Sequence, residues 1–138
     1  MKSKPAILAI VTAALLSAYP AFVLGYTWSH VARAALPGGR HGPLDAYRHA
    51  LASAVVAFTL GPRPVDWVTS VMESSSKPSN AMDRHNNRLG AMVGSQARSF
   101  ADVAPTVRAL VQQGTVEAAD PDQTTWLPPG EWRAGWLW

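Results

Sequence analysis

The feature that most constrains this chain is an uninterrupted apolar segment near its amino terminus. Residues Pro5–Trp28 run for twenty-four positions without a charged side chain and are rich in Ala, Leu, Val and Ile. A helix rises about 1.5 Å per residue, so roughly 20 apolar residues cross a hydrocarbon core about 30 Å thick. Lys2 and Lys4 precede the segment, which favours a cytoplasmic amino terminus and an extracytoplasmic domain. We therefore expect one membrane-spanning helix within residues 1–34.

A cleaved signal peptide is the alternative interpretation of this segment. Val23 and Gly25 are acceptable small residues before a cut at Tyr26. The apolar run exceeds the roughly 7–15 residues of a usual signal-peptide core, which favours a retained, single-pass anchor in a bacterial inner membrane. Pro20 is expected to kink the helix or to mark its last turns. Both interpretations deliver the remaining residues to the periplasmic or extracytoplasmic side.

The composition of the chain excludes several classes of protein. The 138 residues allow one modest core after the apolar segment. From Ser29 onward ten Lys and Arg residues face nine Asp and Glu residues without a basic run, so nucleic-acid binding is not expected. The chain has no cysteine, which excludes disulfides and thiolate metal sites.

Apolar periodicity predicts an all-α fold with about four helices after the anchor. Two prolines and three glycines make residues 35–43 a linker. Ser79 or Asn80 is expected to cap the third helix of the domain that follows. That domain covers residues 44–119, and its helices are expected over residues 44–60, 65–73, 81–98 and 102–113.

Residues 120–138 are expected to form an irregular tail. Three prolines exclude a long helix there. The tail also holds four of the six tryptophans, namely Trp126, Trp132, Trp136 and Trp138. Two interpretations of these indole rings remain open: they pack over a core that is poor in aromatic residues, or they seat the domain in the membrane interface.

Polar residues occupy several helical positions where apolar residues are expected. Asp45 and His49 are four residues apart, so the carboxylate can orient the imidazole. Asp83, Asn86 and Asn87 follow at spacings of three and four on the third helix. Asparagine side chains compete for backbone hydrogen bonds, so two adjacent ones inside a helix require a tertiary reason. We expect these residues to meet at one polar site.

Such a site suits acid–base hydrolysis of an ester, amide or glycosidic bond. An oriented His49 can act as the base, with Asp45 or Glu73, which ends the second helix, as its partner. The amide of Asn87 can stabilise a developing oxyanion. The candidate catalytic residues are His49, Glu73, Asp83 and Asn87, and the supporting residues are Asp45, Arg48, Asn86 and Gly90. The expected substrate is peptidoglycan or a phospholipid of the envelope.

Two alternatives to this hydrolase remain open. No cofactor is expected, and a divalent metal such as zinc on His49, Glu73 and Asp83 is less favoured because the chain has no HExxH or paired-His spacing. In the second alternative the same residues form a polar network that only fixes helix packing, in a non-enzymatic accessory or membrane-active envelope protein. The sequence identifies no protein partner.

Three motifs stand out together: Asp45-Ala-Tyr-Arg-His49-Ala, then Glu73, then Met82-Asp-Arg-His-Asn-Asn87-Arg-Leu-Gly90. This combination resembles an uncharacterised family of bacterial helical domains found in secreted polymorphic toxins and envelope proteins. The family pattern is an aromatic residue before Arg-His-Ala, then His-Glu, then Met-Asp with Asn-Asn and Gly. The resemblance spans about half the domain and implies a shared site at Arg48, His49, Glu73, Asp83, Asn86, Asn87 and Gly90. Met72 departs from the pattern, which has His before the Glu, and this weakens any role that depends on that pair.

Overall fold

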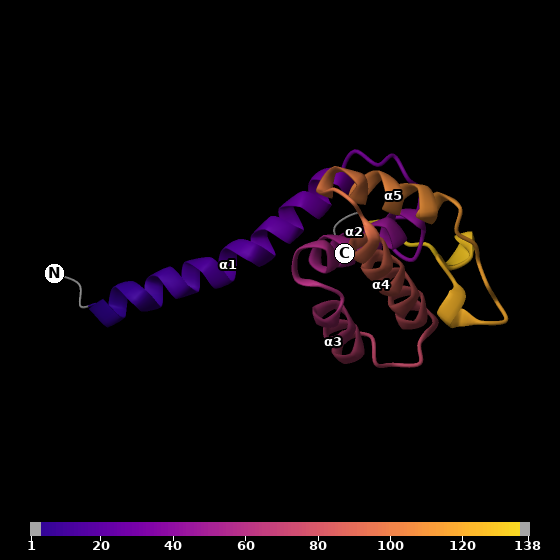
Figure 1. The fold of residues 1–138 in the computed structure, drawn as a ribbon. Helices are drawn as coiled ribbons and strands as arrows, with labels where there is room; N and C mark the ends of the chain where they lie inside the picture. Colours follow the sequence, from indigo (N-terminus) through magenta and orange to yellow (C-terminus); the bar gives the residue numbers. More distant parts are fainter. Residues whose placement is uncertain (1–3, 136–138) are drawn as a thin grey trace.

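The computed structural model describes residues 4–135 and is all-α over that range. Figure 1 shows one long helix projecting from a small bundle of four others, onto which the tail folds back. The predicted fold class, an apolar amino-terminal helix followed by a four-helix bundle, is confirmed. The helices are α1 (Lys4–Val31), α2 (Pro43–Leu60), α3 (Arg63–Met72), α4 (Pro78–Gln96) and α5 (Phe100–Gln112), and the tail holds two short 3-10 turns, η1 (Pro121–Gln123) and η2 (Pro129–Glu131).

Helix α1 is long and apolar enough to cross a membrane, with a mean hydropathy of 2.2 over its most apolar window. Pro20 lies inside it, and the helix continues to Val31, so the expectation that Pro20 marks its last turns is wrong. Proline removes one backbone hydrogen bond, and tertiary packing of the turns that follow can compensate for that loss.

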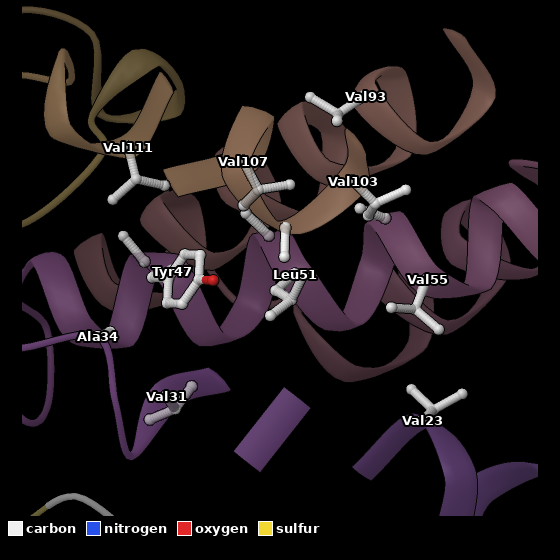
Figure 2. Packing of buried hydrophobic residues seen from close by; sticks show 14 residues of the cluster. Val23, Val31, Ala34, Tyr47, Leu51, Val55, Val93, Val103, Val107 and Val111 are labelled. Carbon is white, nitrogen blue, oxygen red and sulfur yellow. The ribbon is translucent and has the colours of Figure 1, made fainter. Parts of the chain in front are cut away.

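The last turns of α1 belong to the core of the bundle. Val23, Thr27 and Val31 recur every four residues along one face and are buried, whereas the first half of the helix is exposed. Val23 and Val31 lie in the same apolar cluster as Leu51 and Val55 of α2 (Figure 2). Helix α1 is therefore packed on the domain directly and is not joined to it by residues 35–43 alone.

Helix α2 is the central element of the bundle, and α4 approaches it closely. Gly90 and Gly94 of α4 face the α2 backbone: a Cβ atom at Gly90 would overlap the carbonyl oxygen of Ala50, and one at Gly94 that of Ala54. Glycine is required at such positions because no other residue leaves room for a neighbouring backbone. On another side α5 covers α2 with a stripe of buried valines at Val103, Val107 and Val111 (Figure 2).

The observed helix ends differ from the expected ones by a few residues. Helix α4 begins at Pro78, and Lys77 occupies the N-cap position without a side-chain cap, so the expected cap at Ser79 or Asn80 is wrong. Proline is favoured in the first turn because its missing N–H would have no partner there and its φ angle already suits a helix. The same effect starts α3 at Arg63, one residue before Pro64.

The tail returns to the start of the domain and pairs with the linker. The backbone N–H of Leu127 donates to the carbonyl of His41 at 2.8 Å, and Arg40 and Arg133 form an isolated bridge. Trp126 packs against the core, which favours the first interpretation of the tail indoles for that ring. Trp136 and Trp138 lie outside the described residues.

Candidate functional site

Three side chains from α2 and α4 converge where these helices run close together. The Nε2 atom of His49 lies 3.6 Å from Oδ1 of Asp45, one turn earlier on α2, and 3.4 Å from Oδ1 of Asp83 on α4. We call these residues the Asp45–His49–Asp83 cluster. The imidazole thus faces a carboxyl group on its own helix and a second one across the helix interface.

Asp45 is buried, and each of its two carboxylate oxygens contacts a hydrogen-bond donor. Its Oδ2 atom accepts a 2.7 Å hydrogen bond from the backbone N–H of His41, and Oδ1 contacts the guanidinium of Arg48. The Arg48 guanidinium also lies 5.5 Å from the centre of the Trp28 ring on α1. Asp45 stands in the first turn of α2, where a negative charge is favoured by the helix dipole. These contacts suit an ionised, orienting carboxylate.

Burial shifts the pKa values of His49 and Asp83 in opposite directions. The His49 side chain is 25% exposed; burial lowers its pKa, and the carboxylate of Asp45 only partly offsets the effect. The Asp83 side chain is 15% exposed; burial raises its pKa to about 8, assisted by the negative charges of Asp45 and Glu73. Near neutral pH a neutral imidazole therefore stands beside a predominantly protonated carboxyl group.

Glu73 borders the cluster without joining it. It is the C-cap residue of α3 and is half-buried. Its charge raises the pKa values of both His49 and Asp83, but within residues 4–135 its carboxylate makes no ion pair shorter than 4 Å. Its backbone carbonyl accepts a 2.7 Å hydrogen bond from Arg84. Glu73 acts on the cluster through its electric field.

The two adjacent asparagines point to different neighbours. Asn87 accepts a hydrogen bond from Ser53 of α2 at 3.0 Å and donates one to Thr69 of α3 at 3.1 Å, and a hydrogen bond to His49 also raises the pKa of that imidazole. Asn87 therefore ties three helices together beside the cluster. Asn86 is turned toward the tail, where its amide donates to the Thr125 carbonyl at 2.8 Å. The expectation that both asparagines share one site holds in the structure only for Asn87.

Sequence patterns alone missed the contributions of His41, Ser53 and Thr69. His41 stands four residues before Asp45, the same spacing that identified His49, but the spacing rule applies only inside a helix and His41 lies before α2 begins. Ser53 follows His49 by four residues on α2, so its position on the polar side was readable. Thr69 gave no sequence signal, because its role depends on how α3 packs.

A pocket of about 460 Å³ is lined by His41 and by none of the three cluster residues. Lys77 at the start of α4 and the tail residues Trp132 and Arg133 also line it. The Nδ1 atom of His41 lies 3.9 Å from Oδ2 of Asp45, so this residue borders both the pocket and the cluster. The volume is within the range of small-molecule sites, roughly 300–1,000 Å³.

The cluster also has the donor atoms of a metal site. One ligand atom each from Asp45, His49 and Asp83 lie within 4.8 Å of one another. Ligands at about 2.0–2.2 Å from a tetrahedral zinc ion stand roughly 3.3–3.6 Å apart, which the two Nε2 to Oδ1 separations match. The expected ligands were His49, Glu73 and Asp83, and the structure has Asp45 in place of Glu73.

Comparison with known proteins finds no family model, no curated protein and no solved structure that matches this chain. The resemblance drawn from the motifs remains a prediction.

Proposed function

We propose that this chain is a membrane-anchored hydrolase of the bacterial cell envelope, with its domain on the extracytoplasmic side. The observation that carries the proposal is the position of the His49 Nε2 atom, 3.6 Å from Oδ1 of Asp45 and 3.4 Å from Oδ1 of Asp83, whose pKa is raised to about 8. A neutral imidazole that can accept a proton and a protonated carboxyl group that can donate one, within reach of one another and partly open to solvent, meet the requirements of acid–base hydrolysis. Helix α1 supplies the anchor.

In this proposal the two neutral groups divide the work of proton transfer. His49 takes a proton from water as the hydroxyl adds to the substrate carbonyl or phosphoryl centre, and the Asp83 carboxyl gives its proton to the leaving group. The imidazolium then returns a proton to the Asp83 carboxylate, which lies 3.4 Å away in the resting enzyme. Asp45 orients the imidazole and stabilises its charged form, and Asn87 positions it through the hydrogen bond between them.

An anionic envelope substrate fits the adjacent pocket best. Lys77 and Arg133 line it and together outweigh the single carboxylate of Glu131 there. Phospholipids and peptidoglycan peptides both carry negative charge and are both reached from an extracytoplasmic domain. These features support the proposed substrate classes without choosing between them.

The test uses the full chain in detergent against purified peptidoglycan and against anionic phospholipid. We expect His49→Ala to lower turnover by at least about 100-fold, the usual minimum contribution of a general base. The control is His85→Ala, because that imidazole is also half-buried on α4 but interacts with Asp122 rather than with the cluster. If His49→Ala lowers the melting temperature and reduces activity only in proportion to the folded fraction, the network is structural and the non-enzymatic alternative holds.

A metal-assisted variant is the second candidate, because three ligand atoms already lie within 4.8 Å of one another. Its signature is a cation recovered with the purified protein and a melting temperature that falls on chelation. Asp83→Asn should abolish both effects, whereas Asp66→Asn on the exposed face of α3 should change neither. Activity that is insensitive to chelators, with no bound cation, would leave the acid–base mechanism alone.

A further inference from the structure

Helix α3 presents an apolar face to solvent, which is unusual for so short an element. Trp67, Val68, Val71 and Met72 are separated by helical spacings and therefore share one side of the helix. All four are exposed, Trp67 at 69% and Met72 at 68%. The opposite side carries Asp66, and only Val65 and Thr69 are buried against the bundle. The exposed face continues into Leu60 at the end of α2, which is also largely exposed.

The attachment of α1 fixes the level of this face relative to a bilayer. A hydrocarbon core about 30 Å thick takes about 20 helical residues, and counted from Pro5 the span reaches about Leu24. The domain already contacts α1 within that span, because the hydroxyl of Tyr19 is hydrogen-bonded to the hydroxyl of Thr59 near the end of α2. The end of α2 that carries Leu60 is therefore held at the level of the last turns of the span.

Helix α3 begins three residues after Leu60 and lies on the side of the bundle from which α1 projects (Figure 1). An interfacial amphipathic helix buries its apolar side about 5–10 Å into the boundary between headgroups and acyl chains. The domain contacts α1 from Tyr19 onward, whereas the span ends at about Leu24. At 1.5 Å per residue the domain therefore reaches about 7 Å into the span, which is similar to the depth of an interfacial helix. The face of α3 thus lies where lipid is available to cover it.

Two exposed arginines, one at the start of α3 and one just before α5, suit an anionic lipid surface. Arg63 begins α3 and Arg98 precedes α5, and both are exposed and form no ion pair within residues 4–135. Helix α5 starts beside α1, since the Phe100 ring lies 6.1 Å from the Phe22 ring. Tryptophan is the residue most favoured at the boundary of the hydrocarbon core. A second copy of the chain is a poorer occupant, because four side chains of one ten-residue helix fall short of the roughly 800 Å² per partner of a stable interface.

We infer that the exposed face of α3 is seated in the outer surface of the same bilayer that α1 spans. The inference rests on the membrane anchoring proposed above. Two elements then hold the domain, a spanning helix and an interfacial one, so the domain cannot tilt freely about α1. Helix α3 also ends at Glu73, whose charge reaches the cluster, so the site is held at a fixed distance from the lipid surface.

The absence of cysteine permits a direct test by single-cysteine spin labelling. The full chain is reconstituted in vesicles of phosphatidylethanolamine and phosphatidylglycerol, with a label at Val71→Cys on the apolar face. Asp66→Cys on the opposite side of α3 is the matched control, and Leu15→Cys in the exposed first half of α1 reports the span itself. Relaxation by oxygen, which concentrates in lipid, is compared with relaxation by a water-soluble nickel complex.

We expect the ratio of oxygen to nickel accessibility to be severalfold higher at Val71 than at Asp66, and highest at Leu15. Water-like values at both α3 positions with a lipid-like Leu15 would overturn the docking of α3 and leave the anchor intact. A water-like Leu15 would overturn the anchor itself. Dipolar broadening between labels at Val71 would mean that a second copy covers the face, which also overturns the inference. All three substitutions are at exposed positions, so far-UV circular dichroism should remain unchanged.

Discussion

His49 and Asp83 show how one environment produces an acid and a base from ordinary residues. Each loses water on folding, and loss of water disfavours the charged form of either group. The pKa of the imidazole falls and that of the carboxyl rises to about 8, so near neutral pH the imidazole is uncharged and the carboxyl is mostly protonated, whereas an ordinary aspartate would be ionised. The negative charges of Asp45 and Glu73 increase the shift at Asp83 and oppose it at His49.

The shift at Asp83 predicts that the domain is destabilised as pH rises from about 7.5 to 8. The folded protein keeps a proton up to about pH 8 that the unfolded chain releases near 3.8, so this group lowers the free energy of unfolding as pH rises across that interval. The lowered pKa values of His41, His49 and His85 act in the opposite direction up to about pH 7, because there the unfolded chain binds the extra protons. The Asp83 slope is therefore measured above about pH 7.5, at no more than about 1.4 kcal/mol per pH unit.

Thermal melting of the full chain in detergent at several pH values measures this slope. Asp83→Asn should flatten it, because the amide does not titrate. Asp66→Asn, at an exposed position on α3, should keep the wild-type slope. An unchanged slope in Asp83→Asn would show that Asp83 titrates normally and is no proton donor at neutral pH.

Helical spacing alone revealed the local half of the site and missed its tertiary half. The Asp45 and His49 pair follows from a separation of four residues on one helix, and it appears at 3.6 Å. The choice of Asp83 over Glu73 as the second carboxyl neighbour depends on how deeply α4 sinks against α2, which no local pattern encodes. For the same reason Asn86 could not be distinguished from Asn87, although one bonds to the tail and the other to α2 and α3.

At the scale of helices, apolar periodicity predicted all five elements and placed their ends within a few residues. The middle of each helix could be predicted because buried apolar residues recur with the period of an α-helix. The start of α4 was misplaced by three residues because Pro78 acts as a first-turn residue, where proline initiates a helix instead of breaking it, whereas α3 begins within two residues of its expected start. The close approach of α4 to α2 depends on Gly90 and Gly94, and no local pattern shows which neighbouring helix these glycines face.

The close contact of Gly90 with the backbone of α2 predicts that a larger residue at this position destabilises the domain. Gly90→Ala places a Cβ atom against the Ala50 carbonyl, so α4 must move away from α2 and the Asp83 to His49 contact must lengthen. We expect a loss of about 1–3 kcal/mol in the free energy of unfolding, despite the better helix propensity of alanine. Gly25→Ala is the control, since nothing lies within 4 Å of a Cβ atom there. Equal melting temperatures for both variants would show that the helices do not approach as closely as described.

At the scale of the whole molecule, α1 is a helix long and apolar enough to span a membrane, and its last turns are part of the core of the bundle. Its exposed first half has no partner in the bundle within the described residues, whereas Val23, Thr27 and Val31 complete the core beside α2. The sequence shows only a continuous apolar run. It does not show which residues of α1 pack against the bundle and which do not. Cleavage of a signal peptide would remove buried residues of α1 from the core, whereas a retained anchor would keep them. The two alternatives therefore predict different stabilities of the domain as well as different attachment to the membrane.

Truncation from the amino terminus separates these two roles. A chain that starts at Tyr19 loses only exposed turns of α1, so its domain should melt at the temperature of the full chain. A chain that starts at Ala35 loses Val23 and Val31, and burying each valine contributes about 1.5–3 kcal/mol to a total of about 5–15 kcal/mol. It should expose the α1-facing side of α2, bind a hydrophobic dye and lose its cooperative melting transition.

A chain that starts at Tyr26 corresponds to the product of signal-peptide cleavage. Its melting temperature should lie between those of the Tyr19 and Ala35 chains. It keeps Thr27 and Val31 but loses Val23 and the Tyr19 hydrogen bond to Thr59. If the Ala35 and Tyr19 chains melted alike, α1 would be a tether that the domain does not need. If they differ as expected, removal of the anchor after Val31 would unfold the site that it carries, which favours a helix that stays attached to its domain in the working protein.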